Sequence, residues 1–255
     1  MRNLWIRAVV VSVVGLILLP MALAQAPATT PNLSGIWIRS RDAADFGPTV
    51  PIMLPAAKRM YEENRAGTPS GADEGHDQMD PTIYCLPHGF PRAMTVNYPF
   101  EIVQTPNVVY ILFESTQMQR RIYMDGRKMP DNYPTTFLGF STGKYEGDTL
   151  VIETAGLNDL TWMDGRAIPH SDALRVTERI RRAGPTALEI DFRFEDPQSF
   201  ERPWSAKKTY ESRPNVQQIL EMIGYCEDRF RYNYDQKVFK GTVRWQSPEQ
   251  AEGGR

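Results

Sequence analysis

Short apolar runs, and short segments in which apolar and polar residues alternate, dominate the chain from residue 98 onward. FEIVQ and VVYILFE are separated by T-P-N, and FLGFSTGKY and TLVIETA flank E-G-D at 146–148. ALRVTERIRR and ALEIDFRF flank A-G-P, and PWSAKKTYES continues the series. β-Branched and aromatic residues favour strands, whereas the Gly, Pro and Asp residues between these runs favour tight turns. This part of the chain is therefore predicted to form antiparallel sheet.

Helical patterns are few by comparison. One helix is expected over residues 54–67, where Pro55 suits the first turn and Gly67 suits the end. A weaker pattern indicates another helix near 215–223, in a mixed C-terminal segment with strand patterns at YCEDRF and TVRWQ. Eight or more short strands indicate a mainly β fold, either an antiparallel barrel or a sandwich, with one or two short helices. G-I-W, in the first strand at 34–40, resembles the G-x-W of lipocalin-like barrels.

The first 24 residues predict a secretory signal peptide. Arg2 and Arg7 flank the start of an apolar run at 8–20, and Ala22-Leu23-Ala24 forms a small-x-small cleavage site. The run is too short to span a bilayer, although an uncleaved anchor is the alternative interpretation. The protein is thus expected to be exported, periplasmic or extracellular, with no integral membrane span after cleavage. Residues 25–33 form a linker, and 34–255 a single β-rich domain.

The balance of charge argues against nucleic acid as a partner. The chain carries 29 Lys and Arg against 31 Asp and Glu, interspersed without a basic tract. No P-loop and no G-x-G-x-x-G is present, so no cofactor is expected. The acidic loop at 68–80 lacks the EF-hand pattern, and no metal site is predicted. The oligomeric state is left open.

The chain has two cysteines, Cys85 and Cys226. In an exported protein a disulfide between them is expected, and it would tie an N-terminal segment to a C-terminal one. Two buried free thiols are the alternative.

The sequence M-D-G-R occurs twice, at 124–127 and 163–166. Asp-Gly is a strong tight-turn dipeptide, so the two copies are interpreted as two similar turns. The second copy alone is followed by a histidine and a serine, at 170 and 171.

Strand alternation places two charged residues on inward faces. Glu178 shares a face with Val176 and Ile180, and Arg120 shares a face with Ile122. One interpretation is an internal ion pair that holds the strand register. The other is a polar patch lining a pocket, in which burial would raise the pKa of the carboxyl group toward the range of a general acid.

His170 follows a predicted turn and has carboxylates nearby in the sequence, so it could act as a general base. The alternative is a histidine that stabilises a turn. The candidate catalytic residues are His170, Glu178 and Asp164, and the candidate ligand-binding residues are Arg120, Tyr123, Asp125, Asp159, Trp162 and Ser171. A G-x-S-x-G match at 139–143 is discounted, because a hairpin rather than a strand–turn–helix surrounds it.

Six blocks resemble a family of uncharacterised secreted bacterial proteins. They are PNLSGIW, DP-x-x-x-C-x-P at 80–87, PFEIVQTP, YEGDTLVIET, LNDLTWMDG and PHSDALRVTER. The resemblance implies no established reaction. In related sequences histidine often stands where this chain has Ile168 and Arg175, whereas His170 and Glu178 match. A metal site is thus further disfavoured, and His170 and Glu178 become the better candidates.

Three functions remain open from the sequence. The first is a barrel that binds a small, largely apolar or amphipathic molecule in an interior pocket. The second is a cofactor-independent lyase, hydratase or isomerase that uses Glu178 and His170, with Arg120 stabilising negative charge. The third is a non-catalytic envelope interaction protein. Barrels support all three, so fold alone does not separate them.

Overall fold

The computed structural model describes residues 30–40, 45–66, 80–84 and 86–220. The predicted signal peptide, both cysteines and the strand patterns at YCEDRF and TVRWQ lie outside the described residues, as does nearly all of the predicted acidic loop.

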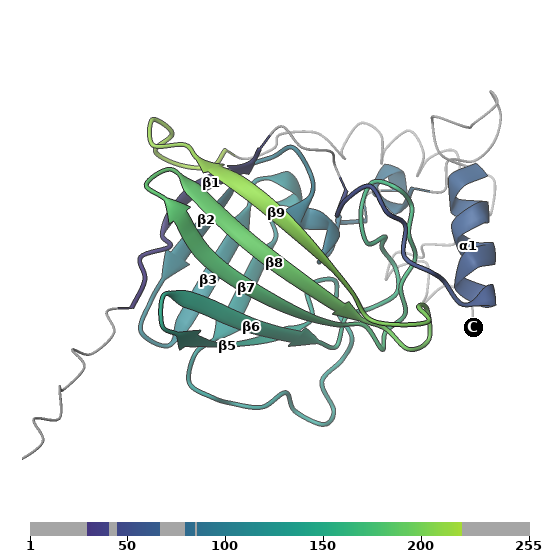
Figure 1. Ribbon diagram of the computed structural model, residues 1–255. Helices are drawn as coiled ribbons and strands as arrows, with labels where there is room; N and C mark the ends of the chain where they lie inside the picture. The colour runs from purple at the N-terminus through teal and green to yellow at the C-terminus, as the bar shows by residue number, and fades with distance from the viewer. Residues whose placement is uncertain (1–29, 41–44, 67–79, 85, 221–255) are drawn as a thin grey trace, which may run out of the picture.

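Nine strands form one closed barrel, in which each strand pairs with its neighbours in the chain and the last pairs with the first (Figure 1). The strands are β1 (Gly35–Arg39), β2 (Phe100–Gln104), β3 (Val108–Phe113), β4 (Gln119–Tyr123), β5 (Phe140–Glu146), β6 (Thr149–Ala155), β7 (Arg175–Gly184), β8 (Ala187–Glu195) and β9 (Trp204–Ser212). The predicted mainly β fold is confirmed, and of its two forms the structure adopts the barrel rather than the sandwich.

One junction differs from the predicted antiparallel sheet. β4 and β5 run parallel, and they pair only at Ile122 with Ser141 and at Tyr123 with Thr142. All the other neighbouring pairs are antiparallel. Because parallel neighbours need a connection that returns the chain to the starting end, a long connection must link β4 to β5.

The predicted helix is confirmed as α1 (Pro55–Ala66). Three single-turn 3₁₀ helices are also present: η1 (Pro81–Tyr84), η2 (Arg92–Met94) and η3 (Ser115–Gln117). The prediction of a helix near 215–223 is wrong for residues 215–220, which form neither helix nor strand. Among the described residues, no helix has the length and apolar character needed to cross a membrane.

The two ends of the barrel are built differently. At one end short turns join β2 to β3, β5 to β6 and β7 to β8, at the T-P-N, E-G-D and A-G-P positions that the sequence predicts. At the other end lie α1 and the longer connections (Figure 1). We call this second end the lid, and it comprises residues 45–66, 86–99, 156–174 and 196–203.

Side chains fill the bore of the barrel. Strand residues such as Trp37, Ile111 and Phe192 are at most 1% exposed and belong to one apolar cluster. The lid adds Phe90 and Met94 to this cluster, and the Tyr210 hydroxyl donates a hydrogen bond of 2.9 Å to the carbonyl oxygen of Met94. The lid is therefore packed into the barrel as part of its core.

Residues 124–139 connect β4 to β5 along the outside of the wall, and we call them the arch. The arch ends at Gly139, where φ is +63°. A Cβ at this position would lie 2.6 Å from the backbone oxygen of Ala155. Both the positive φ and the close approach of the chain thus require glycine at this bend.

We predict that Gly139→Ala lowers the free energy of unfolding by about 2–4 kcal/mol, because it combines a left-handed backbone with a steric clash. Gly147→Ala is the matched control, since Gly147 has a φ of +62° but a Cβ added there would have no other atom within 4 Å. It should cost only about 1–2 kcal/mol. Urea denaturation of both variants measures the difference, and equal losses would contradict the proposed clash.

Candidate functional site

The barrel contains a buried ion pair between Arg120 of β4 and Glu178 of β7. Their side chains are 1% and 0% exposed, respectively. Arg120 donates from Nη1 to Glu178 Oε1 at 3.1 Å, and its Nη2 donates to Oε2. The predicted inward orientation of both residues is confirmed, and the strand register brings them together as a bidentate pair.

Three further groups surround the guanidinium of this pair. Arg120 Nε donates to Ser141 Oγ at 3.1 Å, and Nη2 also donates to Thr154 Oγ1 at 2.8 Å. The Phe90 ring lies 3.8 Å from the guanidinium carbon. Buried charges are tolerated when their hydrogen-bonding capacity is met, as it is here. This geometry is that of a structural pair, while the catalytic role of Glu178 stays a prediction.

His170 lies in the lid just before β7, and it is buried rather than open to solvent. Its Nδ1 is 3.1 Å from the carbonyl oxygen of Ser171, and its Nε2 is 3.4 Å from Thr161 Oγ1. A carbonyl can only accept, so the proton is on Nδ1 and Nε2 accepts from the threonine. Burial lowers the pKa of His170, which keeps the ring neutral. The arrangement favours the alternative of a histidine that stabilises a turn.

Ser171 has a structural contact of its own. Its backbone N–H and its hydroxyl both donate to the carboxylate of Asp196, each at 2.7 Å, and so join the start of β7 to the turn after β8. Asp159, a further predicted residue of this loop, is exposed. Within the described residues no hydrogen bond joins His170 to Asp164 or Glu178. The predicted catalytic residues are therefore not assembled into one hydrogen-bonded group.

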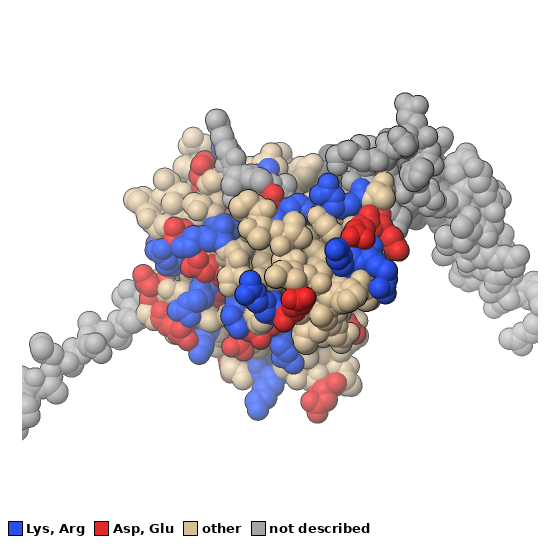
Figure 2. Space-filling model, turned by 45° about the vertical axis from the view of Figure 1, so that its right-hand side comes forward, with Lys and Arg blue, Asp and Glu red and all other residues tan. Residues whose placement is uncertain are grey.

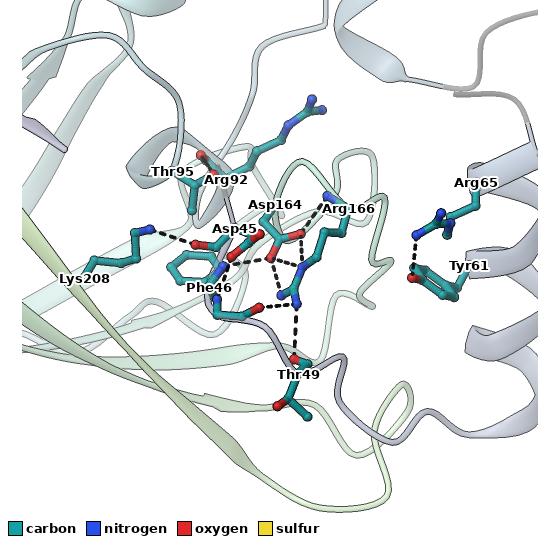
Figure 3. Close-up of polar contacts among 11 residues, drawn as sticks. Asp45, Phe46, Thr49, Tyr61, Arg65, Arg92, Thr95, Asp164, Arg166 and Lys208 are labelled. Atoms are coloured by element: carbon teal, nitrogen blue, oxygen red, sulfur yellow. Dashed lines mark hydrogen bonds and ion pairs between the residues drawn. The ribbon is translucent and has the colours of Figure 1, made fainter. Parts of the chain in front are cut away.

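Asp164 anchors the segment that crosses the lid, which we call the strap (residues 45–54). Fully buried, it accepts hydrogen bonds from the Phe46 N–H at 3.1 Å and from Arg166 Nη2 at 2.6 Å. Arg166 also donates to the carbonyl oxygen of Thr49 at 3.2 Å. Figure 3 shows the strap passing between this pair and Lys208, whose Nζ donates to the carbonyl oxygen of Asp45 at 2.9 Å. These contacts hold the Phe46 ring against Phe192 and Phe194.

The two M-D-G-R copies share one set of hydrogen bonds but differ in backbone conformation: Gly126 has a φ of +75°, whereas at the second copy the residue with a positive φ is Ala167, at +66°. In each, the backbone N–H of the arginine donates to Oδ1 of the aspartate two residues earlier, at 3.2 Å for Arg127 and 2.9 Å for Arg166. The arginine side chain then folds back onto the same carboxylate. In the first copy these hydrogen bonds lower the pKa of Asp125 to about 2. The predicted similarity is therefore confirmed for the aspartate–arginine contacts but not for the backbone; the first copy is exposed on the arch and the second is buried in the lid.

His88 was not among the predicted residues, although it lies in a comparable buried setting. It is 7% exposed, and its Nδ1 is 3.3 Å from Ser115 Oγ. Burial, followed by the positive charge of Arg92, lowers the pKa of His88 to about 4. It is one of three histidines in the chain, and the P-H-G-F-P-R stretch in which it stands has no periodic pattern that would indicate burial.

Arg92 connects His88 to the predicted residue Trp162. The guanidinium lies 5.1 Å from the Trp162 ring centroid and makes a bidentate pair with Asp80, at 2.8 and 2.6 Å. Burial raises the pKa of Asp80, but the hydrogen bonds and charge of Arg92 outweigh it, so that the net shift is downward. Trp162 is 4% exposed, and its contact with Arg92 therefore packs the lid internally.

Tyr123 and Asp125, the remaining predicted residues, belong to the outer wall and the arch. The Tyr123 ring stacks on Phe140 with centroids 5.1 Å apart, and the Arg127 guanidinium lies 4.2 Å from its centroid. Beside this stack a hollow of about 620 Å³, which we call the outer hollow, opens between the arch and β5–β7. Its lining includes Arg127, Lys128, Met129, Phe140, Val151 and Arg175. The described residues contain no cluster of three side chains suited to a metal ion.

Charges elsewhere on the wall are interleaved. Arg179 pairs with Glu146 at 2.9 Å, and Lys207 pairs with Asp191 at 3.2 Å. On the face shown in Figure 2, Lys and Arg alternate with Asp and Glu rather than gathering into a patch of one sign.

No family model matches the chain. No curated protein matches it either. Among solved structures, a crystal structure of a mutant of the fluorescent protein UnaG matches at 13% identity with a TM-score of 0.33, covering 71% of this chain and 96% of that chain. Because both the sequence identity and the TM-score are low, this similarity supports no conclusion about function. The assignment of a closed barrel is based on the strand pairing itself.

We predict that Glu178→Gln lowers the free energy of unfolding by about 3–5 kcal/mol, because it leaves the Arg120 charge buried without its counterion. Glu146→Gln is the matched control, since Glu146 pairs with an arginine on the same wall but is 40% exposed. Its cost should stay below about 1 kcal/mol. Urea denaturation measures both variants. A Glu178→Gln protein as stable as the control would rule out a structural role for the pair.

We also predict that His88 makes stability depend on pH. Because its pKa in the folded protein is about 4 against an ordinary 6.5, the unfolded chain binds the proton more strongly. The contribution is complete above pH 6.5 and is lost as pH falls toward 4, by about 3 kcal/mol in all. His88→Asn retains a polar side chain without titrating in this range. The loss of stability between pH 7 and pH 4.5, measured by urea denaturation, should be smaller in this variant than in wild type, and equal losses would contradict the assignment.

Proposed function

We propose that this protein is an exported, non-catalytic barrel that binds a small anionic amphiphile in the outer hollow. The observation that carries the proposal is the combination of an apolar floor and a basic rim in one hollow of about 620 Å³. This volume is within the range of typical small-molecule sites. Export is inferred from the sequence pattern of the first 24 residues, and it would place the site in the periplasm or outside the cell.

The floor of the outer hollow can contact an apolar group. Phe140, Val151 and Ala155 come from the outer faces of β5 and β6, and Met129 comes from the arch. Phe140 is held in place by the Tyr123 and Tyr133 rings, each with its centroid 5.1 Å from that of Phe140. Burying an apolar chain against this floor would contribute about 25 cal/mol for each Å² removed from water.

The rim favours a negatively charged group. Arg127, Lys128, Lys144 and Arg175 line the hollow, against Glu153 and Glu195. Arg127 and Lys144 already pair with acidic neighbours. Lys128 and Arg175, by contrast, form no ion pair with any other residue that the structure describes. A carboxylate on the ligand would supply a counterion for these two cations.

The bore of the barrel, where the sequence placed the pocket, supports binding less well. Its centre is occupied by the Arg120–Glu178 pair and by Phe90. A ligand there would have to displace the lid from the apolar core, and it would have to compete with satisfied hydrogen bonds. We therefore place the binding site on the outer wall instead of in the interior, and we still expect the ligand to be amphipathic.

Calorimetric titration of the protein with laurate, and with dodecanol as its uncharged counterpart, tests this function. Laurate is expected to bind, and Arg175→Gln should weaken its affinity about five-fold, equivalent to about 1 kcal/mol for one partly exposed charge pair. The affinity for dodecanol should be lower and insensitive to the change. Arg181→Gln is the matched control, because Arg181 lies on the same strand but outside the outer hollow. Equal laurate affinity of the two variants, or no binding to wild type, would overturn the proposal.

A further inference from the structure

A second hollow lies between β4 and the end of the arch, and we call it the aromatic hollow. Its volume of about 390 Å³ is within the range of small-molecule sites. Among the described residues, Phe140 is the only one that lines both this hollow and the outer hollow. The strand contributes Gln119, Arg121 and Tyr123, whose side chains point outward in alternation with the two buried residues of β4. The two hollows are therefore separate places on the wall.

Four aromatic rings line the aromatic hollow, those of Tyr123, Tyr133, Phe137 and Phe140. Tyr123 and Phe140 stack with their ring centroids 5.1 Å apart, and the Tyr133 ring meets Phe140 edge-on at the same distance. Phe140 is buried, whereas the other three side chains are half-buried and keep part of their surface open. Aromatic rings prefer edge-to-face and offset-stacked neighbours, so an aromatic ligand would extend this set of contacts.

Backbone hydrogen bonds fix the end of the arch on both sides of the aromatic hollow. The Phe90 N–H donates to the Phe137 carbonyl at 2.7 Å, which ties the arch to the lid. The Thr136 N–H donates to the Gly156 carbonyl at 2.9 Å, and the Asn158 N–H donates to the Thr136 carbonyl at 2.9 Å, which ties the arch to the end of β6. The hollow is thus preformed, and a ligand would not have to order the arch in order to bind.

The aromatic hollow has one positive charge. Arg121 is the only charged residue among the described residues that line it. It is exposed, and it forms no ion pair and no side-chain hydrogen bond with any other residue that the structure describes. Arg127, which lies over the opposite side of the aromatic stack, is by contrast paired with Asp125. Because a guanidinium recognises a carboxylate through two parallel hydrogen bonds, Arg121 favours a carboxylate as the polar group of a ligand.

We propose that the aromatic hollow is a second binding site, which takes a planar aromatic carboxylate of one or two fused rings. The ring system packs among the aromatic side chains, and the carboxylate pairs with Arg121. A smaller volume and fixed walls favour a compact, rigid ligand over a flexible chain, because a planar ring system has less conformational freedom to lose on binding. This inference goes beyond the proposed function and does not depend on it, since the two sites use different cations.

Calorimetric titration of the protein with 2-naphthoate tests the second site. Wild type is expected to bind it, and Arg121→Gln should weaken the affinity about five-fold, as expected for the loss of one exposed charge pair. Arg181→Gln is the matched control, because Arg181 is an arginine of the barrel wall that lines neither hollow. The uncharged counterpart, 2-naphthalenemethanol, should bind more weakly than 2-naphthoate and with equal affinity to the two variants.

Two further comparisons test the nature of the ligand and the location of the site. Decahydro-2-naphthoate keeps the charge but not the aromatic rings, so it should bind at least about three-fold more weakly than 2-naphthoate, and Phe137→Leu should reduce this preference. Arg175→Gln alters the outer hollow and should leave the affinity for 2-naphthoate unchanged. Arg121→Gln, in turn, should leave the affinity for laurate unchanged.

Failure of wild type to bind 2-naphthoate, or equal affinities of the Arg121→Gln and Arg181→Gln proteins, would overturn the inference. Equally tight binding of the saturated compound, or an unchanged preference in Phe137→Leu, would contradict an aromatic ligand. A loss of 2-naphthoate affinity in Arg175→Gln would assign this ligand to the outer hollow instead. Because laurate binding is measured separately, failure of the second site and failure of the proposed function can be distinguished.

Discussion

The ion pair between Arg120 and Glu178 is the interaction on which the closure of this barrel depends. It joins β4 to β7, and the hydroxyls of Ser141 on β5 and Thr154 on β6 complete the coordination of the guanidinium. Four consecutive strands therefore meet at one buried cation. A slip of any of them by one residue would turn its polar group to the outer face and leave the rest unpaired, so the pair sets the register where the parallel junction is short.

The position of the lid depends on the same ion pair. Phe90 covers the guanidinium, and the preceding residue, Gly89, has so little space that a Cβ would lie 2.9 Å from the side chain of Thr161. Thr161 in turn contacts His170. The two buried histidines, Arg92 with its partner Asp80 from the preceding segment, and the Asp164–Arg166 pair are thus the polar groups of a lid packed onto the ion pair. Buried ionisable groups must be either neutral or paired with an opposite charge. The neutral histidines and the ion pairs of the lid therefore do not by themselves indicate catalysis.

Local patterns in the sequence were sufficient to predict much of this fold. Period-two alternation placed Glu178 and Arg120 inside, and Gly and Asp located the hairpin turns, because both signals depend only on neighbouring residues. The contacts that define the lid join distant residues, as between Phe46 and Asp164, which are 118 positions apart. No local pattern encodes such a contact. Equally, His88 could not be distinguished from a surface histidine until its burial against Ser115 was known.

The parallel junction accounts for the features of the outer wall. Since β5 runs in the same direction as β4, the chain must return along the barrel before β5 can begin, and the filled bore leaves only the outside for this return. The arch is that return. On one side the arch encloses the outer hollow. On the other, Gly139 turns the chain in toward Ala155, and β5 pairs with β4 only at Ile122 and Tyr123. One change of strand direction thus explains why the outer hollow lies on the wall of the barrel, while the ion pair and the apolar core fill the interior.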